Sequence, residues 1–500
     1  MLKRRLDLWL PTYALETPAR LAGKLARRNR LTHLIFLVCD HYEPRHQAKR
    51  TDQPAERVST WHREYAAMQR RCEARFGTTP LHTFFYPPHH GSEHLPALAQ
   101  MVFDGLGEVE LHYHHHGDTA ETLRRNLGAS LADYRSWGLL QESGEQPTQR
   151  FGFIHGDWAL DNSCHGRYCG VNGELSILEE FGCWGDLTMP SANEAQTRKI
   201  NSIYYAVDNP ARSKSHDWGE DAAVGRRPDG FFLMQGPLGI NWRAPGYPRI
   251  ENASLTTENW GRADRIRKWI DCQVHVKGRP EWLFIKLHTH GAVERDFDGL
   301  FGERAFEMHR LLNEHYNDGQ RFKLHYVTAR QACNIAKAAE DGKAGDPSQW
   351  LDYRIAKPAH AFYVLDAPHR LERCTAQHLT LTGITAASGQ DAQLRTRIGP
   401  IHSVSGPLRS LDLDARQGLL TLEAPEPGSN VTLTVVPHFE LLGVEGGNLT
   451  AAPPADGDMQ TLRFTAGPRT VIRFQRAGQP DSSSPGAQPA APLTQPRAHA

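Results

Sequence analysis

Short apolar runs alternate with longer amphipathic segments over the first two thirds of the chain. The run HLIFLVCD at 33–40 is continuous and apolar, which is typical of a strand buried on both faces of a sheet. The segment from about 54 to 75 then places aromatic and apolar residues at helical spacing. Further strands are predicted at 81–87, 107–114, 151–158, 281–291 and 322–329. This alternation predicts an α/β domain at 31–345, with a parallel sheet closed or nearly closed into a barrel and helices outside it.

The pattern changes near residue 350. After Pro358, short apolar runs such as LTLTGI, LLTLEA and NVTLTVVP recur at short intervals, with Gly, Pro and Asp between them. This spacing is typical of an all-β sandwich, which we place at 355–475 as a smaller second domain. The last segment, 477–500, is rich in Pro, Ala, Ser and Gln and lacks the apolar residues that a core needs. We expect this tail to be disordered.

Composition excludes some classes of partner. The 57 basic and 57 acidic residues balance, so no net charge draws the protein to nucleic acid. The eight cysteines include no CxxC pair, and we interpret them as mostly reduced. No run of about 18 uncharged apolar residues is present, so we expect no transmembrane segment. The oligomeric state stays open.

The amino-terminal segment, 1–30, is basic and is predicted to form a leader helix. Charges and Pro11 interrupt its apolar residues, so we find no signal peptide in it. We therefore expect a cytoplasmic protein. The stretch ARLAGKLARRNR could also lie on a membrane surface as an amphipathic helix, but a solvated helix packed on its own domain is the preferred interpretation.

Ionisable residues follow the predicted barrel strands at their carboxyl ends. Active sites of such barrels lie at this face, so we expect the side chains of five strand ends to converge there. These residues are Asp40 and His41; His89 and His90; His112, His114, His115, His116 and Asp118; His155 and Asp157; and His288 and His290.

Histidine nitrogens and a carboxylate are the donors that zinc or a similar divalent ion prefers. A catalytic ion needs three protein ligands and one open position, where it activates water and polarises a carbonyl. A carboxylate would then accept the proton of the water, and a histidine would protonate the leaving group. The alternative is that LHYHHHGDT, at 111–119, is only a polar turn whose histidines bond to backbone and water.

The long loops carry further candidate residues. Trp158 and Trp184 lie in or beside them, and their flat rings suit stacking against sugars, although packing beneath loops is an equal alternative. Cys164 and Cys169 flank His165 in NSCHGRYCG. A second zinc site there lacks an obvious fourth ligand, so a free or buried cysteine pair is the preferred interpretation.

The order of these motifs resembles that of the NodB-homology polysaccharide deacetylases, the carbohydrate esterases of family four. TFF at 83–85 resembles the second strand of that family, and GEVELHYHHHGD resembles its segment with a metal-binding HxxxH motif. The resemblance covers about 30 to 335 and implies a distorted (β/α)7-type barrel that binds one divalent ion. VCDHYEP and HGDWALDNS also resemble an uncharacterised bacterial branch of this superfamily, which is associated with exopolysaccharide genes.

The resemblance also implies roles for single residues. Asp40 takes the place of the catalytic base, and His41 stands where the family has a metal-binding aspartate. His288 takes the place of the acid histidine, with His290 as the second choice. Two registers of the HxxxH motif stay open, with the ligand pair at His114 and Asp118 or at His112 and His116. The groove arginine of the family has no counterpart in FIHGDW.

The first hypothesis is a metal-dependent hydrolase that removes N- or O-acetyl groups from a saccharide, with zinc as the preferred divalent metal and the identity of the metal left open. Its site residues are Asp40, His288 and Asp157 for catalysis; His41, His114, Asp118, His112 and His116 for the metal; and His89, His155, Trp158, Trp184 and His290 for the substrate. A second hypothesis is a glycoside hydrolase that uses paired carboxylates such as Asp40 and Asp157. A third is an inactive barrel that binds saccharide or serves as a scaffold.

Overall fold

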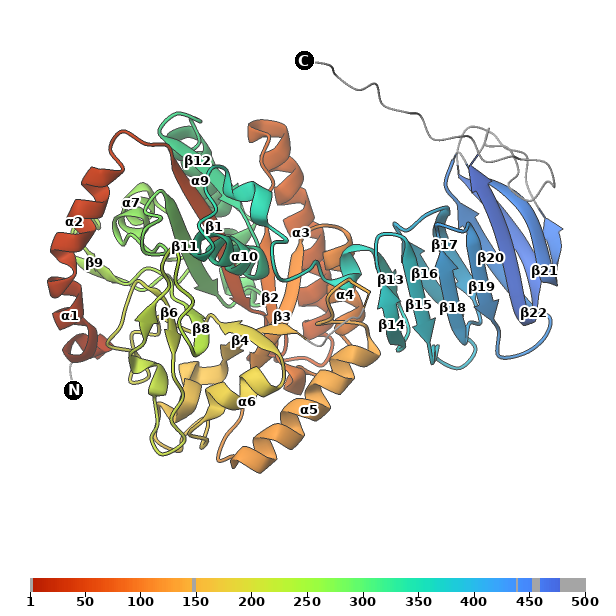
Figure 1. The fold of residues 1–500 in the computed structure, drawn as a ribbon, viewed down its shortest axis with the longest axis horizontal. Coiled ribbons are helices and arrows are strands. Elements are labelled where there is room, and N and C mark those ends of the chain that lie inside the picture. Colours follow the sequence, from red (N-terminus) through yellow and green to blue (C-terminus); the bar gives the residue numbers. More distant parts are fainter. Residues whose placement is uncertain (1–2, 146–149, 438, 452–458, 477–500) are drawn as a thin grey trace, which may run out of the picture.

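The computed structural model describes residues 3–145, 150–437, 439–451 and 459–476. The chain is a mixed α/β protein with a mainly parallel sheet and a separate antiparallel sheet (Figure 1). The predicted change from alternating strands and helices to strands alone is therefore confirmed. The predicted disordered tail at 477–500 lies outside the described residues.

The amino-terminal part is built on a sheet of ten strands in the order β11-β1-β2-β3-β4-β5-β8-β6-β7, with β12 also paired to β1. Each position of β1 is buried, as its continuous apolar run predicts. The strands are β1 (Thr32–His41), β2 (His82–Tyr86), β3 (Gly107–Tyr113), β4 (Phe151–His155), β5 (Cys183–Asp186), β6 (Ile203–Ala206), β7 (Glu220–Asp221), β8 (Phe231–Met234), β11 (Trp282–Thr289) and β12 (Phe322–Tyr326).

Helices connect these strands and pack on the sheet. The largest, α3, buries Val58, Trp61 and Tyr65 in the main core, which matches the helical spacing of its apolar residues. Thr328 and Gln331 form a reciprocal capping box at the start of α10. The helices are α1 (Leu6–Leu15), α2 (Thr17–Ala26), α3 (Gln53–Phe76), α4 (Leu95–Phe103), α5 (Ala120–Ser136), α6 (Glu174–Glu180), α7 (Ala263–Asp271), α8 (Phe297–Leu300), α9 (Glu303–Tyr316) and α10 (Ala329–Glu340).

The mainly parallel sheet departs from a regular barrel. β6 runs antiparallel to both β7 and β8, and β11 and β7 end the hydrogen-bonded order without a pair between them in the described part of the chain. A small hairpin of β9 (Gly239–Asn241) and β10 (Arg249–Glu251) stands apart. The parallel strands are as predicted, whereas a closed seven-fold repeat is not confirmed.

The carboxyl-terminal strands form one antiparallel sheet of ten strands in the order β13-β16-β17-β20-β22-β19-β18-β15-β14, with β21 paired to β22. They are β13 (Tyr363–Leu365), β14 (Arg370–Cys374), β15 (His378–Thr382), β16 (Ala392–Thr396), β17 (Ile401–Gly406), β18 (Ser410–Asp414), β19 (Leu419–Glu423), β20 (Ser429–Val435), β21 (Phe439–Ala451) and β22 (Gln460–Arg476). Val404 and Val431, from β17 and β20 on one side of the β20–β22 pair, share a core with Leu381 and Leu420, from β15 and β19 on the other side. The antiparallel strands are as predicted, whereas a sandwich of two separate sheets is not confirmed, because the β20–β22 pair joins the described strands into one sheet.

The two parts contact each other along the α4 side of the first sheet (Figure 1). The backbone of Ser143 donates to the carbonyl of Lys357 at 2.6 Å, and that of Gly144 to Cys374 at 2.6 Å. At the opposite edge, the predicted leader helix is two helices, α1 and α2, and Trp9 of α1 is fully buried. No helix in the described ranges is long and apolar enough to cross a membrane.

Candidate metal centre at the carboxyl ends of the strands

Three side chains converge just beyond the carboxyl ends of β1 and β3. Glu43 follows β1 by two residues, His112 lies in β3, and His114 directly follows that strand. His114 Nε2 is 2.9 Å from His112 Nε2 and 3.2 Å from Glu43 Oε1, and the other two atoms are 4.0 Å apart. Two ligands about 2.0 Å from a tetrahedral ion lie about 3.3 Å apart, so this spacing suits a shared ion. We call these three residues site 1.

The two histidines of site 1 differ in charge, because His112 presents an acceptor nitrogen to the centre whereas His114 is held in its charged form. His112 Nδ1 donates to the carbonyl of Ile154 at 2.9 Å, and burial lowers the pKa of His112 to about 3, so its Nε2 carries a lone pair. His114 Nδ1 faces Asp157 Oδ2 at 3.2 Å. Burial opposes a charge on His114, but its hydrogen bonds to Asp157 and Glu43 raise its pKa to about 9. The centre favours a positive charge, and two imidazoles with one carboxylate fit a zinc-like divalent ion.

Two buried histidines beside site 1 have unpaired ring nitrogens. Nε2 of His41 and Nδ1 of His288 have no hydrogen-bond partner within the described residues. The centroid of the His41 ring lies 4.6 Å from that of His112. The ring centroids of His41 and His288 lie 5.7 Å and 6.0 Å from that of Trp158. Buried polar atoms are seldom left unpaired, so these two nitrogens are candidates for contact with a bound molecule.

Two other predicted histidines lie at the margin of site 1. His290 Nδ1 is 3.1 Å from Glu43 Oε2, and its side chain is partly exposed. His89 is exposed, with its ring 5.0 Å from the His114 ring. His89, His90 and Glu43 also form a group whose ligand atoms converge. The predicted substrate residues His89 and His290 are therefore brought close to the predicted metal residues.

Asp40 is fully buried and both of its oxygens are engaged. Oδ1 accepts a hydrogen bond from the backbone of Gly291 at 2.6 Å, and Oδ2 lies 3.2 Å from His82 Nε2. A Cβ at Gly291 would lie 2.0 Å from Oδ2, so only glycine allows this close approach. The Asp40 side chain thus ties the end of β1 to the loop after β11.

Two residues of the predicted metal set point elsewhere. Asp118 Oδ2 lies 3.0 Å from Nδ1 of His115 and is outside site 1. His116 is exposed, and its Nδ1 accepts a hydrogen bond from the backbone of Tyr168 at 3.0 Å. Neither of the two HxxxH registers considered from the sequence is therefore reproduced by site 1, in which the two histidines are two residues apart.

Two of the predicted substrate-binding residues, His155 and Trp184, lie away from site 1. His155 is fully buried and lies 2.9 Å from His115, Nε2 to Nε2, on the other side of the histidine run. Trp184 is buried in β5 and packs over Gly152, where a Cβ would lie 2.3 Å from the indole. Trp184 therefore belongs to the core of the sheet, whereas Trp158 lies beside site 1.

Sequence reasoning missed Glu43. Glu43 lies in the stretch VCDHYEP, two residues beyond the end of the strand. The sequence-based prediction considered only the residues at the strand end itself, Asp40 and His41. The strand ends at His41, and the chain then turns so that the Glu43 carboxylate reaches both His114 and His290. A carboxylate two residues past a strand end was the available signal.

No family model and no curated protein matches the chain. Among solved structures, a "putative polysaccharide deacetylase" from Mycobacterium smegmatis matches with a TM-score of 0.34 and 12% identity, over 62% of this chain and 92% of that one. The catalytic module of a family 98 glycoside hydrolase from Streptococcus pneumoniae matches with a TM-score of 0.17 and 7% identity, over 91% of this chain and 86% of that one. TM-scores this low carry no argument about fold or function.

Proposed function

We propose that the chain is a metal-dependent hydrolase that removes acetyl groups from a saccharide. The observation that carries the proposal is site 1, in which two imidazole nitrogens and one carboxylate oxygen lie within 4.0 Å of one another, so that a divalent ion would take the place of the hydrogen between His114 and Glu43. His114 is 28% exposed, so one side of the site is open to a substrate. Catalytic metal sites have this combination of three protein ligands and an open side.

Glu43, His112 and His114 hold the ion in this proposal. When bound, a divalent ion polarises the acetyl carbonyl and lowers the pKa of a water molecule. Asp157 orients His114 through its Nδ1, as carboxylates commonly do for metal-binding histidines. Asp40 is a positioning residue, because its two oxygens are occupied by Gly291 and His82.

The proton transfers fall to the two histidines with unpaired nitrogens. His41 Nε2 would accept the proton of the attacking water and later release it to solvent, and His288 Nδ1, which takes up a proton from solvent, would donate that proton to the departing nitrogen or oxygen. The two ring centroids lie 6.0 Å apart, so both can serve one reacting group. The indole of Trp158 contacts both rings and supplies a flat face for the sugar.

The glycoside hydrolase alternative needs two accessible carboxylates. The side chain of Asp157 is 45% exposed, but that of Asp40 is 0% exposed and both of its oxygens are bonded. The geometry therefore favours metal-dependent deacetylation over a mechanism with this carboxylate pair.

The test compares His112→Ala with His116→Ala, a matched control from the same histidine run. Zinc-loaded proteins are analysed for metal content and for acetate release from acetylated chitin oligosaccharides. We expect His112→Ala to lose one equivalent of metal and nearly all acetate release, and His116→Ala to keep both. Equal metal content and equal turnover in the two variants would refute the proposal.

A further inference from the structure

A second group of metal-binding side chains lies next to site 1. His115 follows β3, His155 ends β4, Cys169 lies in the loop after β4, and Glu174 begins α6. His155, Cys169 and Glu174 are all 0% exposed. We call these four residues site 2, which contains no residue of site 1.

The ligand atoms of site 2 have the spacing of a tetrahedral centre. His115 Nε2 lies 2.9 Å from His155 Nε2 and 3.1 Å from Glu174 Oε1, and His155 Nε2 lies 3.4 Å from the same oxygen. Ligands of a tetrahedral zinc ion lie about 3.3 Å apart when each is about 2.0 Å from the metal. One atom of each of the four residues lies within 4.8 Å of all the others.

The partners of the outer ring nitrogens make these inner atoms acceptors. His155 Nδ1 lies 2.5 Å from the carbonyl of Gly156, which can only accept, so Nδ1 carries the hydrogen. His115 Nδ1 donates in the same way to Asp118 Oδ2 at 3.0 Å. In the neutral tautomers set by these bonds, two lone pairs and a carboxylate oxygen of Glu174 face one another in a buried space. In the metal-free protein a second hydrogen on His115 can bond to Glu174 Oε1 at 3.1 Å, and a divalent ion would take the place of that hydrogen.

Cys169 completes the group with a sulfur atom. Its Sγ accepts a hydrogen bond from the backbone of Val171 at 3.4 Å and lies 3.7 Å from Glu174 Oε2. Burial raises the pKa of the Cys169 thiol, so without a cation it stays protonated. Metal binding breaks the S–H bond, forms a metal–sulfur bond and releases the proton to solvent.

The 156–173 loop, between His155 and Glu174, has a strained backbone that a metal bound at site 2 would stabilise. Six of its non-glycine residues have positive φ: Asp157, Trp158, Asp161, Asn162, His165 and Tyr168. Each costs about 1 kcal/mol or more relative to ordinary backbone. The same loop carries Asp157 and Trp158 to site 1.

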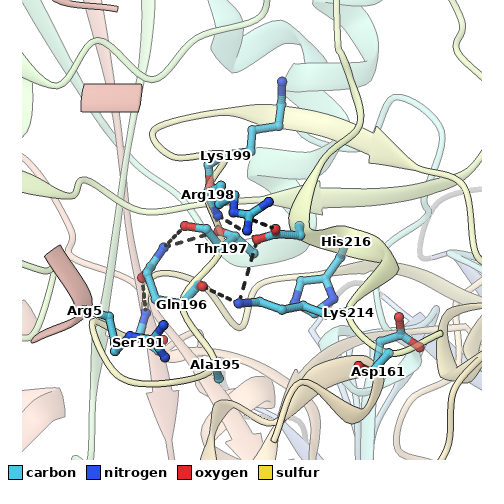
Figure 2. A network of polar contacts seen from close by, with 12 residues as sticks. Arg5, Asp161, Ser191, Ala195, Gln196, Thr197, Arg198, Lys199, Lys214 and His216 are labelled. Atoms are coloured by element: carbon cyan, nitrogen blue, oxygen red, sulfur yellow. Dashed lines mark hydrogen bonds and ion pairs between the residues drawn. The ribbon is translucent and has the colours of Figure 1, made fainter. Parts of the chain in front are cut away.

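A network of hydrogen bonds around Asp161 also holds the 156–173 loop in place. The backbone of Asp161 donates to Glu174 Oε2 at 2.6 Å, and the Asp161 carboxylate accepts from the backbones of Gly173 and Ser215. Figure 2 shows Asp161 near Lys214, whose Nζ donates to the carbonyl of Gln196 at 2.6 Å. Glu174 is thus held in place by neighbouring backbone.

We propose that His115, His155, Cys169 and Glu174 bind zinc as a closed structural site that fixes the 156–173 loop against site 1. Four protein ligands, three of them fully buried, leave no open position, which is the arrangement of structural rather than catalytic zinc. The mixture of sulfur, imidazole and carboxylate ligands also suits zinc better than calcium or magnesium.

Cobalt(II) tests the proposal directly, because a thiolate bound to cobalt gives a charge-transfer absorption in the near ultraviolet. Site 1 contains no cysteine, so this band reports on site 2 alone. The protein is stripped with a chelator, reconstituted with Co²⁺, and compared with three variants. We expect the band in the wild type, Cys164→Ser and His112→Ala. In Cys169→Ser we expect loss of the band together with one equivalent of bound cobalt.

Cys164 is the matched control, because it lies in the same loop but outside site 2. The wild-type spectrum requires no variant to fold, and circular dichroism checks each variant. A folded, cobalt-reconstituted wild type without the band would overturn the proposal, as would a band that persists in Cys169→Ser. Loss of metal in His112→Ala alone would support site 1 and refute site 2, so the two proposals fail separately.

Discussion

The buried ion pair between Arg330 and Glu108 allows a quantitative test of how α10 is fastened to β3. Both side chains are at most 9% exposed, and Arg330 contacts Glu108 through two nitrogens at 2.7 and 3.1 Å. Arg330 also donates to the carbonyl of Ile355 at 2.7 Å, and Thr328 donates to Glu108 at 2.6 Å. Arg330→Met would remove the charged partner and leave a buried carboxylate with one hydroxyl donor.

Removal of one partner of a buried ion pair costs about 3 to 5 kcal/mol. At roughly 2 °C per kcal/mol for a domain of this size, the melting temperature should fall by roughly 6 to 10 °C. The control is Arg71→Met, because the pair of Arg71 with Glu303 is exposed and contributes little to stability. Differential scanning calorimetry measures both variants, and the double variant Arg330→Met/Glu108→Leu should recover much of the loss. A loss no larger than that of Arg71→Met would refute the reasoning.

Two further predictions concern pH and backbone packing. Burial lowers the pKa of His309 to about 3, so between about pH 6.5 and 3 the unfolded chain binds a proton that the folded chain does not. The free energy of unfolding should therefore fall as the pH falls, by about 2 kcal/mol between pH 6.5 and 5. Urea unfolding at several pH values measures this free energy, and its decrease between pH 6.5 and 5 should be about 2 kcal/mol smaller in His309→Gln than in the wild type. An equal decrease in the two proteins would contradict the prediction. Gly291→Ala should cost about 1 to 3 kcal/mol, because its Cβ would meet Asp40, whereas Gly144→Ala has open space and should cost little. Equal melting temperatures for the two glycine variants would count against this contact.

The sequence predicted the local elements well where one physical pattern dominates. The strand predicted at 33–40 is β1, Thr32–His41, and the helix predicted at about 54 to 75 is α3, Gln53–Phe76. Continuous apolar residues and helical spacing are enough here, because each element is buried through its own side chains. The sequence also predicted that the ionisable residues after the parallel strands lie at one edge of the sheet, because the carboxyl ends of parallel strands meet there.

The pairing of those ionisable residues was decided by the tertiary structure. β3 and β4 are in register with His112 beside Ile154, which orients the His112 ring, while His115 turns toward His155. Neighbours within one histidine run therefore enter two different groups. Spacing along the chain could not separate them, because strand register and the turn after the strand set the directions of the side chains.

Long-range contacts also supplied the partners that the sequence lacked. The CxHxxxC stretch around Cys169 has no obvious fourth ligand nearby in the chain. In the structure, His115 after β3, His155 at the end of β4 and Glu174 at the start of α6 lie beside Cys169. The carboxyl-terminal strands were likewise visible as alternating runs, but the β20–β22 pair that makes them one sheet was not. Apolar periodicity sets which face of an element is buried, whereas contacts between distant segments depend on packing that no local pattern contains.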